Sequence, residues 1–130
     1  MTEALQQVHD HFLKLLLAQP GTARALMCER LPPGFAARLT GDDPKLLSGD
    51  FIDPKLLEQR SDLLYELPLR DPDSTCLCLL EHKSKPDPFI ELQLLGYLVA
   101  SWQYLRSRHG PGTLLPVILP LVVYNGAPTW

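Results

Sequence analysis

Two kinds of hydrophobic pattern alternate along this chain. In some segments apolar residues recur every three or four positions, which is typical of amphipathic helices, and in others they alternate or run together, which is typical of strands. The helical pattern predicts helices over 3–18, 22–30 and 89–108 and a short one over 35–39. Between the predicted helices over 35–39 and 89–108, the patterns favour strands.

The first predicted helix is amphipathic. Asp10 and Lys14 lie four residues apart on its polar side, as an exposed ion pair would. Its apolar stripe consists of Leu5, Val8, Phe12, Leu15 and Leu16. Pro20 and Gly21 end this helix, because neither residue favours its continuation.

The central strand is predicted over 75–83, a nearly continuous apolar run that ends in Glu81, His82 and Lys83. The segment 61–69 alternates instead, with one face made by the odd-numbered residues Leu63, Tyr65, Leu67 and Leu69 and the other by Asp62, Leu64 and Glu66. Asp71, Pro72 and Asp73 form a turn between the two segments. We therefore expect a hairpin.

The later elements predict the topology. Asp87 is suited to cap the helix over 89–108 with Pro88 as its first residue, and 114–124 is a second buried strand. A strand, a long helix and another strand imply a parallel crossover. A short edge strand over 45–52 and a turn over 53–58 are further expectations. The fold class is α/β, a small mixed sheet flanked by helices on both sides.

Composition narrows the class of protein. With 130 residues one domain is expected, and 45% hydrophobic residues argue against disorder. A net charge of −3 gives no basic signature for nucleic acid, although metal-binding carboxylates also add negative charge. Three cysteines in apolar surroundings favour reduced thiols in a cytoplasmic protein. The late apolar run is too short for a membrane span and contains Pro116 and Pro120.

The candidate chemistry lies at the end of the central strand. Side chains two apart share a face, so Glu81 and Lys83 point the same way. The hairpin places Asp62 opposite Glu81 to within about a residue, and opposed side chains are only ~5 Å apart. Two carboxylates that close repel each other unless a cation or a proton lies between them. The alternative for Glu81 and Lys83 is a solvated ion pair of little energy.

The order of these residues resembles a known superfamily. Asp62, then Glu81-x-Lys83, then Gln93-x-x-x-Tyr97 is similar to the PD-(D/E)XK nucleases. More narrowly, the chain resembles the Rpn (YhgA-like) recombination-promoting nucleases, also described as transposases. The segments that carry this likeness are His9-Asp10, Leu31-Pro32, Phe51-Ile52-Asp53, Ser61 to Tyr65, Leu80 to Ser84, Leu115-Pro116 and Tyr124-Asn125-Gly126.

The resemblance implies a restriction-endonuclease-like core and an endonuclease that cleaves DNA with Mg²⁺ or Mn²⁺, linked to recombination or mobile elements. Asp62, Glu81 and the backbone carbonyl of His82 would hold the metal, and Lys83 would orient the attacking water and stabilise charge on the phosphate. Gln93 and Tyr97 would line the groove. Asp10 would be a further acid near the metal.

The resemblance also bears on the whole protein. Family members usually continue into a further C-terminal region, so residues 1–130 are expected to be the N-terminal part of a longer chain. The expected partner is DNA, with no membrane, and a homodimer is left open.

Two departures from the family pattern keep alternatives open. Ser61 replaces the proline of the superfamily name, and Lys83 stands where the narrower group often has glutamine. Gln93 and Tyr97 are explained equally well as site or core residues, and Asp10 as a surface residue. The alternative function is a catalytically inactive domain that binds nucleic acid or a partner protein.

Overall fold

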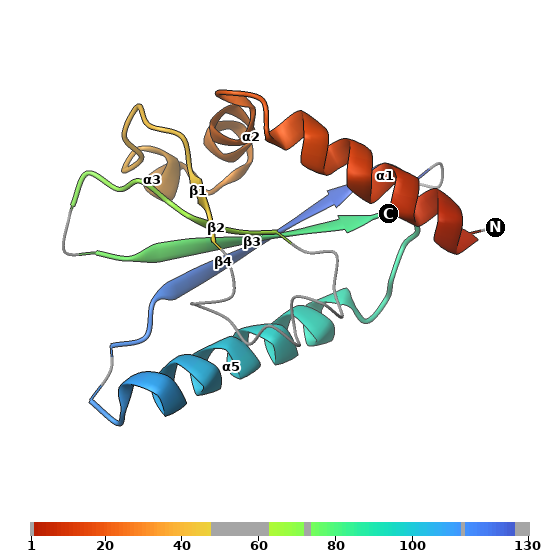
Figure 1. Cartoon of the computed structure of the whole chain (residues 1–130). Coiled ribbons are helices and arrows are strands. Elements are labelled where there is room, and N and C mark those ends of the chain that lie inside the picture. Colours follow the sequence, from red (N-terminus) through yellow and green to blue (C-terminus); the bar gives the residue numbers. More distant parts are fainter. Residues whose placement is uncertain (1, 48–62, 72–73, 113, 127–130) are drawn as a thin grey trace.

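The computed structural model describes residues 2–47, 63–71, 74–112 and 114–126, with the backbone alone at 2–7, 9 and 10. Among the described residues, the three helices that precede the sheet lie on one of its faces and a long helix, α5, lies on the other (Figure 1). The elements are α1 (Thr2–Leu17), α2 (Thr22–Arg30), α3 (Pro33–Ala36), β1 (Lys45–Leu46), β2 (Leu63–Glu66), β3 (Cys76–Lys83), α5 (Ile90–His109) and β4 (Val117–Tyr124). The predicted turn over 53–58 lies outside the described residues.

The sheet has the strand order β1-β2-β3-β4. β2 pairs with β3 in antiparallel register, with Leu63 opposite Leu80. β4 pairs with β3 in parallel register from Cys76 and Val117 to Lys83 and Tyr124. These pairings confirm the predicted mixed sheet, in which a hairpin is followed by a parallel crossover through a long helix.

Both faces of β3 are covered, which explains its continuous apolar run. Cys76, Cys78 and Leu80 pack in a cluster with Met27 of α2 and Leu17 of α1. The alternate residues Leu77 and Leu79 pack instead with Leu94 and Tyr97 of α5. From Cys76 to Leu80, β3 thus lies between two packed layers.

β2 confirms the predicted alternation within a shorter strand. Leu63, Tyr65, Leu67 and Leu69 all belong to or pack against the cluster beneath α2. Leu64 faces the other way, into the cluster beneath α5. The strand ends at Glu66, the Leu67 N–H still donates to the Cys76 carbonyl at 2.9 Å, and the Pro68 carbonyl accepts a hydrogen bond from the Thr40 N–H.

The apolar stripe predicted for α1 does not mark the face that the helix buries. Val8, Phe12 and Leu15 are 57–65% exposed, and Leu16 is 44% exposed. Leu17 is buried and Leu13 packs beside it, so the contact is made near the C-terminal end of the helix. Gly21, at φ 80°, turns the chain there and donates its N–H to the Asp43 carboxylate. This turn, set by a distant residue, helps to fix how α1 lies on the sheet.

Pro120 lies in β4, whose neighbour among the described residues is β3. The Asn125 N–H donates to the Lys83 carbonyl at 3.1 Å. Because backbone N–H groups alternate in direction along a strand, the odd-numbered residues of β4 point theirs toward β3. Position 120 points away from β3, where no described strand pairs with β4, so the proline removes no hydrogen bond from the sheet as described.

Candidate active site

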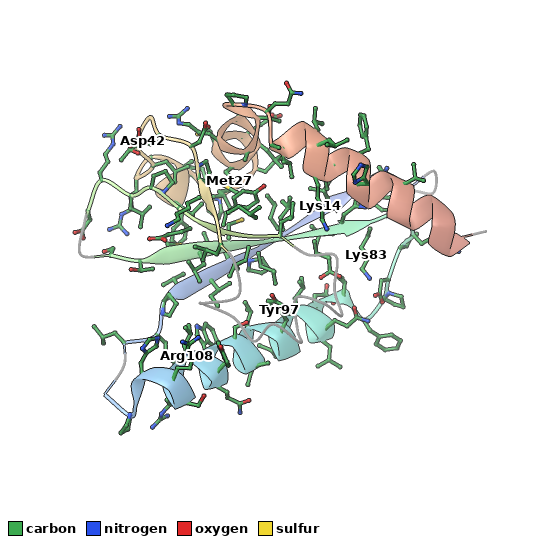
Figure 2. The ribbon with its side chains drawn as sticks, in the orientation of Figure 1. Lys14, Met27, Asp42, Lys83, Tyr97 and Arg108 are labelled. Carbon is green, nitrogen blue, oxygen red and sulfur yellow. The ribbon has the colours of Figure 1, made fainter. Side chains whose placement is uncertain are left out.

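Glu81 and Lys83 lie at the end of β3, on the side of the sheet that faces α5. Glu81 is only 6% exposed. The Lys83 ammonium lies 3.5 Å from Glu81 Oε1. Figure 2 shows Lys83 on the α5 side of the strand end, while α1 crosses the opposite side. The prediction that the two side chains share a face is confirmed, and the carboxylate is largely buried.

A second carboxylate also contacts Lys83. Asp87 Oδ2 lies 3.3 Å from Lys83 Nζ. The other oxygen, Oδ1, accepts a hydrogen bond of 2.9 Å from the backbone N–H of Phe89. This backbone hydrogen bond, followed by the Lys83 contact, lowers the pKa of Asp87. The ammonium is therefore shared between two acids, one on the strand and one just before α5.

The predicted helix cap at Asp87 is thus partly right. The α-helix begins at Ile90, two residues later than Pro88 was expected to begin it. Asp87 stabilises the preceding turn instead, where its carbonyl accepts the Ile90 N–H at 3.3 Å. Its side chain still accepts a hydrogen bond from a backbone N–H that the helix leaves unused.

His82 faces the opposite side of the strand, as the alternation predicts. The side chain is largely buried, and its Nε2 lies 3.1 Å from Asn125 Oδ1. The Asn125 N–H in turn donates to the Lys83 carbonyl. Asn125 therefore contacts the end of β3 through both its side chain and its backbone.

The remaining predicted site residues lie on α5, on α1 or outside the described residues. Tyr97 points from α5 toward the sheet and is 2% exposed, as a core residue (Figure 2). Gln93, four residues earlier, is exposed on the same helix. Asp10 belongs to α1, but its side chain is outside the description. Asp62 lies outside the described residues, so the predicted pair with Glu81 stays a prediction.

The described residues supply some of the oxygen ligands that a metal site would need. Mg²⁺ prefers oxygen ligands and is commonly held by one or two carboxylates together with water and substrate. Glu81 offers a buried carboxylate whose counter-ion is the Lys83 ammonium. The next residue, His82, offers its backbone carbonyl. Within the described ranges, no group of three or more His, Cys, Asp or Glu residues could hold a metal ion.

Sequence reasoning missed the contact of Asp87 with Lys83 and the role of Asn125. A signal for Asp87 existed, because it follows Lys83 by four residues across a short segment that contains Pro86. Such a segment folds back easily, although the sequence does not say that the carboxylate turns toward the lysine. The Asn125 contacts depend on the parallel register of β4, which spacing alone does not give.

The chain matches a known protein family over most of its length. The family model described as "Putative transposase, YhgA-like" matches residues 7–130, nearly the whole chain. The chain belongs to this YhgA-like family. The narrower resemblance predicted from the sequence is confirmed.

Curated YhgA-like relatives carry nuclease names. The chain is 34% identical over 119 residues to "Recombination-promoting nuclease RpnA" of Escherichia coli K12, covering 91% of this chain and 40% of RpnA. It is 32% identical to RpnD of Escherichia coli O157:H7, another protein so named, covering 92% of this chain and 45% of RpnD. RpnE of Escherichia coli K12, named as an inactive nuclease-like protein, is 28% identical, covering 97% of this chain and 42% of RpnE. The chain thus spans less than half the length of these three YhgA-like relatives.

No solved structure is significantly similar to this chain. In the part of the chain that the structure describes, no helix combines the length and the apolar character that crossing a bilayer needs.

Proposed function

We propose that this chain is the nuclease domain of a recombination-promoting nuclease and hydrolyses phosphodiester bonds in DNA with Mg²⁺ or Mn²⁺. The observation that carries the proposal is the buried Glu81 carboxylate beside the Lys83 ammonium at the end of the central strand. RpnA and RpnD, the nuclease-named relatives, support the reaction class. The proposal includes a cytoplasmic location, where DNA is available.

The register of the hairpin supports Asp62 as the second acid. Leu63 pairs with Leu80, and Leu64 pairs with Leu79. Leu64 and Leu79 both belong to the cluster that faces α5. Even-numbered residues of β2 therefore share a face with odd-numbered residues of β3. If this register continued by one residue beyond Leu63, Asp62 would pair with Glu81, as the sequence predicts.

The residues have separate roles in the proposed reaction. Glu81 and Asp62 would bind the metal, with the His82 carbonyl as a third oxygen. When bound, a divalent cation polarises the phosphate and lowers the pKa of a coordinated water. Lys83 would hold the attacking water in place and stabilise the negative charge that develops on the phosphate oxygens. Asn125 would keep the end of β3 in register with β4.

Cleavage of supercoiled plasmid DNA tests the proposal. We expect nicking with Mg²⁺ or Mn²⁺, none with EDTA, and a loss of about 100-fold or more in Asp62→Ala and Lys83→Ala. Lys45→Ala removes an exposed lysine from β1 and is the matched control, which should cleave like wild type. Cleavage that both site substitutions leave unchanged, or no cleavage with any divalent metal, would contradict the proposal.

A second candidate function is an inactive domain that binds DNA or a partner protein. RpnE, a relative that is named as an inactive nuclease-like protein, supports the inactive alternative. Calorimetric titration with Mg²⁺ separates the two candidates, because the nuclease requires a metal site that depends on Glu81. An inactive domain would bind DNA or a partner protein without cleaving DNA. Its wild-type and Glu81→Gln forms would give the same Mg²⁺ titration.

A further inference from the structure

We propose that Asp87 is a positioning residue that holds the Lys83 ammonium in place when Glu81 binds the metal. The inference rests on the proposed function, because it assigns Glu81 to a metal ion and Lys83 to the water and phosphate. Asp87 itself is neither a metal ligand nor a group that touches the reacting atoms. It acts through Lys83.

The geometry consists of one ammonium between two carboxylates. Lys83 Nζ lies 3.5 Å from Glu81 Oε1 and 3.3 Å from Asp87 Oδ2. The three side chains are 25%, 8% and 20% exposed, so water screens these contacts less than it screens surface ion pairs. Glu81 and Asp87 therefore compete for the Lys83 ammonium.

A metal ion would change this balance. A divalent cation held by Glu81 would repel the nearby ammonium and neutralise the carboxylate that Lys83 contacts. Without a second acid, Lys83 would either leave the site or compete with the metal for Glu81. With Asp87 present, the ammonium keeps a counter-ion at the edge of the site, and the Glu81 oxygens are available to the metal.

Asp87 is held firmly enough for this role. Its Oδ1 accepts the Phe89 N–H at 2.9 Å, which leaves Oδ2 directed at Lys83. Its carbonyl accepts the Ile90 N–H, so the residue is attached to the first turn of α5 through both side chain and backbone. A side chain fixed in this way can position a neighbour without losing much conformational freedom.

Asp87→Asn separates positioning from helix capping. Asparagine is as good a cap as aspartate, so its side-chain oxygen can still accept the Phe89 N–H, but the negative charge beside Lys83 is lost. The control is Glu91→Gln, which removes an exposed acid from the first turn of the same helix. If Asp87 only caps the turn, both variants should behave like wild type.

We expect Asp87→Asn to lower the affinity for Mg²⁺ and the kcat of DNA cleavage each by about tenfold, a typical effect of removing a group that orients a metal site. The thermal midpoint should stay near that of wild type. Calorimetry with Mg²⁺ alone measures the affinity, and the plasmid assay measures kcat. Glu91→Gln should leave both unchanged.

The double variant Lys83→Met with Asp87→Asn tests whether Asp87 acts through the lysine. In the Lys83→Met background, Asp87→Asn should not change Mg²⁺ affinity further, because no ammonium remains to be positioned. A further tenfold loss there would make Asp87 a direct ligand and overturn the proposal, as would equal affinities for wild type and Asp87→Asn. Absence of Mg²⁺ binding in wild type overturns both proposals, whereas Mg²⁺ binding that depends on Asp87 without DNA cleavage overturns only the nuclease.

Discussion

Burial controls the ionisation of individual residues on β3. Cys78 is fully buried at the centre of the strand, and this burial, with a smaller effect of Cys76, raises its pKa from 9.0 to about 12. Burial raises the pKa of Cys76 as well. Both thiols therefore stay neutral at physiological pH, which fits them for packing and makes them poor nucleophiles and metal ligands.

The raised pKa of Cys78 predicts a loss of stability in alkali. The unfolded thiol ionises near pH 9, whereas the folded one stays protonated up to about pH 12, so the unfolded state binds fewer protons in this window. The stabilisation is fully present below pH 9 and is lost as the pH rises toward 12. Between pH 8 and pH 10 we expect Cys78 to account for a loss of about 1 kcal/mol in the free energy of unfolding.

Urea denaturation at the two pH values measures this loss. Cys78→Ala is the control, because it removes the titrating group while Tyr65 and Cys76, which burial shifts in the same direction, remain. The variant is less stable overall, and its stability should fall less between the two pH values. An equal fall in the variant and in wild type would contradict the assignment to Cys78.

At the site, single residues show where sequence reasoning succeeds and fails. The common face of Glu81 and Lys83 follows from the two-residue repeat of a strand, which is a local property of the backbone. The contact of Asp87 with Lys83 depends on how the segment 84–86 folds back, and Tyr97 is in the core because of how α5 is rotated on the sheet. Neither property is local, so sequence reasoning left the place of Tyr97 open and missed the contact of Asp87.

At the scale of elements, α5 has two apolar sides, only one of which packs against the sheet. Leu94 is 8% exposed and belongs to the core cluster, whereas Leu92, two residues earlier, is 69% exposed. The helix is predictable from its length and composition. The packed face is not, because apolar residues surround much of the helix.

This difference predicts the effect of two matched substitutions in α5. Leu94→Ala should lower the free energy of unfolding by about 2–3 kcal/mol, because it leaves a cavity against the sheet. Leu92→Ala should change it by less than about 0.5 kcal/mol, because the side chain is already in water. Urea denaturation of both variants measures the two effects. Similar losses in both variants would mean that the outer side of α5 is also packed.

The same reasoning applies to α1. The pattern placed the helix almost correctly, at 3–18 against Thr2–Leu17. The richer apolar stripe with Phe12 is exposed, and Leu13 and Leu17 make the contact with the core instead. A hydrophobic stripe shows that a helix has a preferred side, but the partner that covers this side need not lie within the described residues.

For the whole molecule, the topology could be predicted because connection lengths restrict it. Only residues 67–75 join β2 to β3, too few for the crossover that parallel pairing needs, whereas the twenty-residue helix α5 allows β4 to return in parallel. The place of β1 beside β2 could not be predicted, because a strand of two residues carries too little pattern. Short edge elements are fixed by their neighbours more than by their own sequence.

Pro120 has a consequence for the behaviour of many molecules together. An outer strand edge with regularly spaced donors is a template on which strands of other copies can add, and this is how sheets grow into fibrils. A proline with its nitrogen on that side interrupts the row of donors in the middle of β4. Pro120→Val should restore the missing donor and preserve the fold, but increase light scattering in concentrated solution over hours. The control Pro33→Ala, at the start of α3, should stay clear, and a clear Pro120→Val solution would show that the edge is protected in some other way.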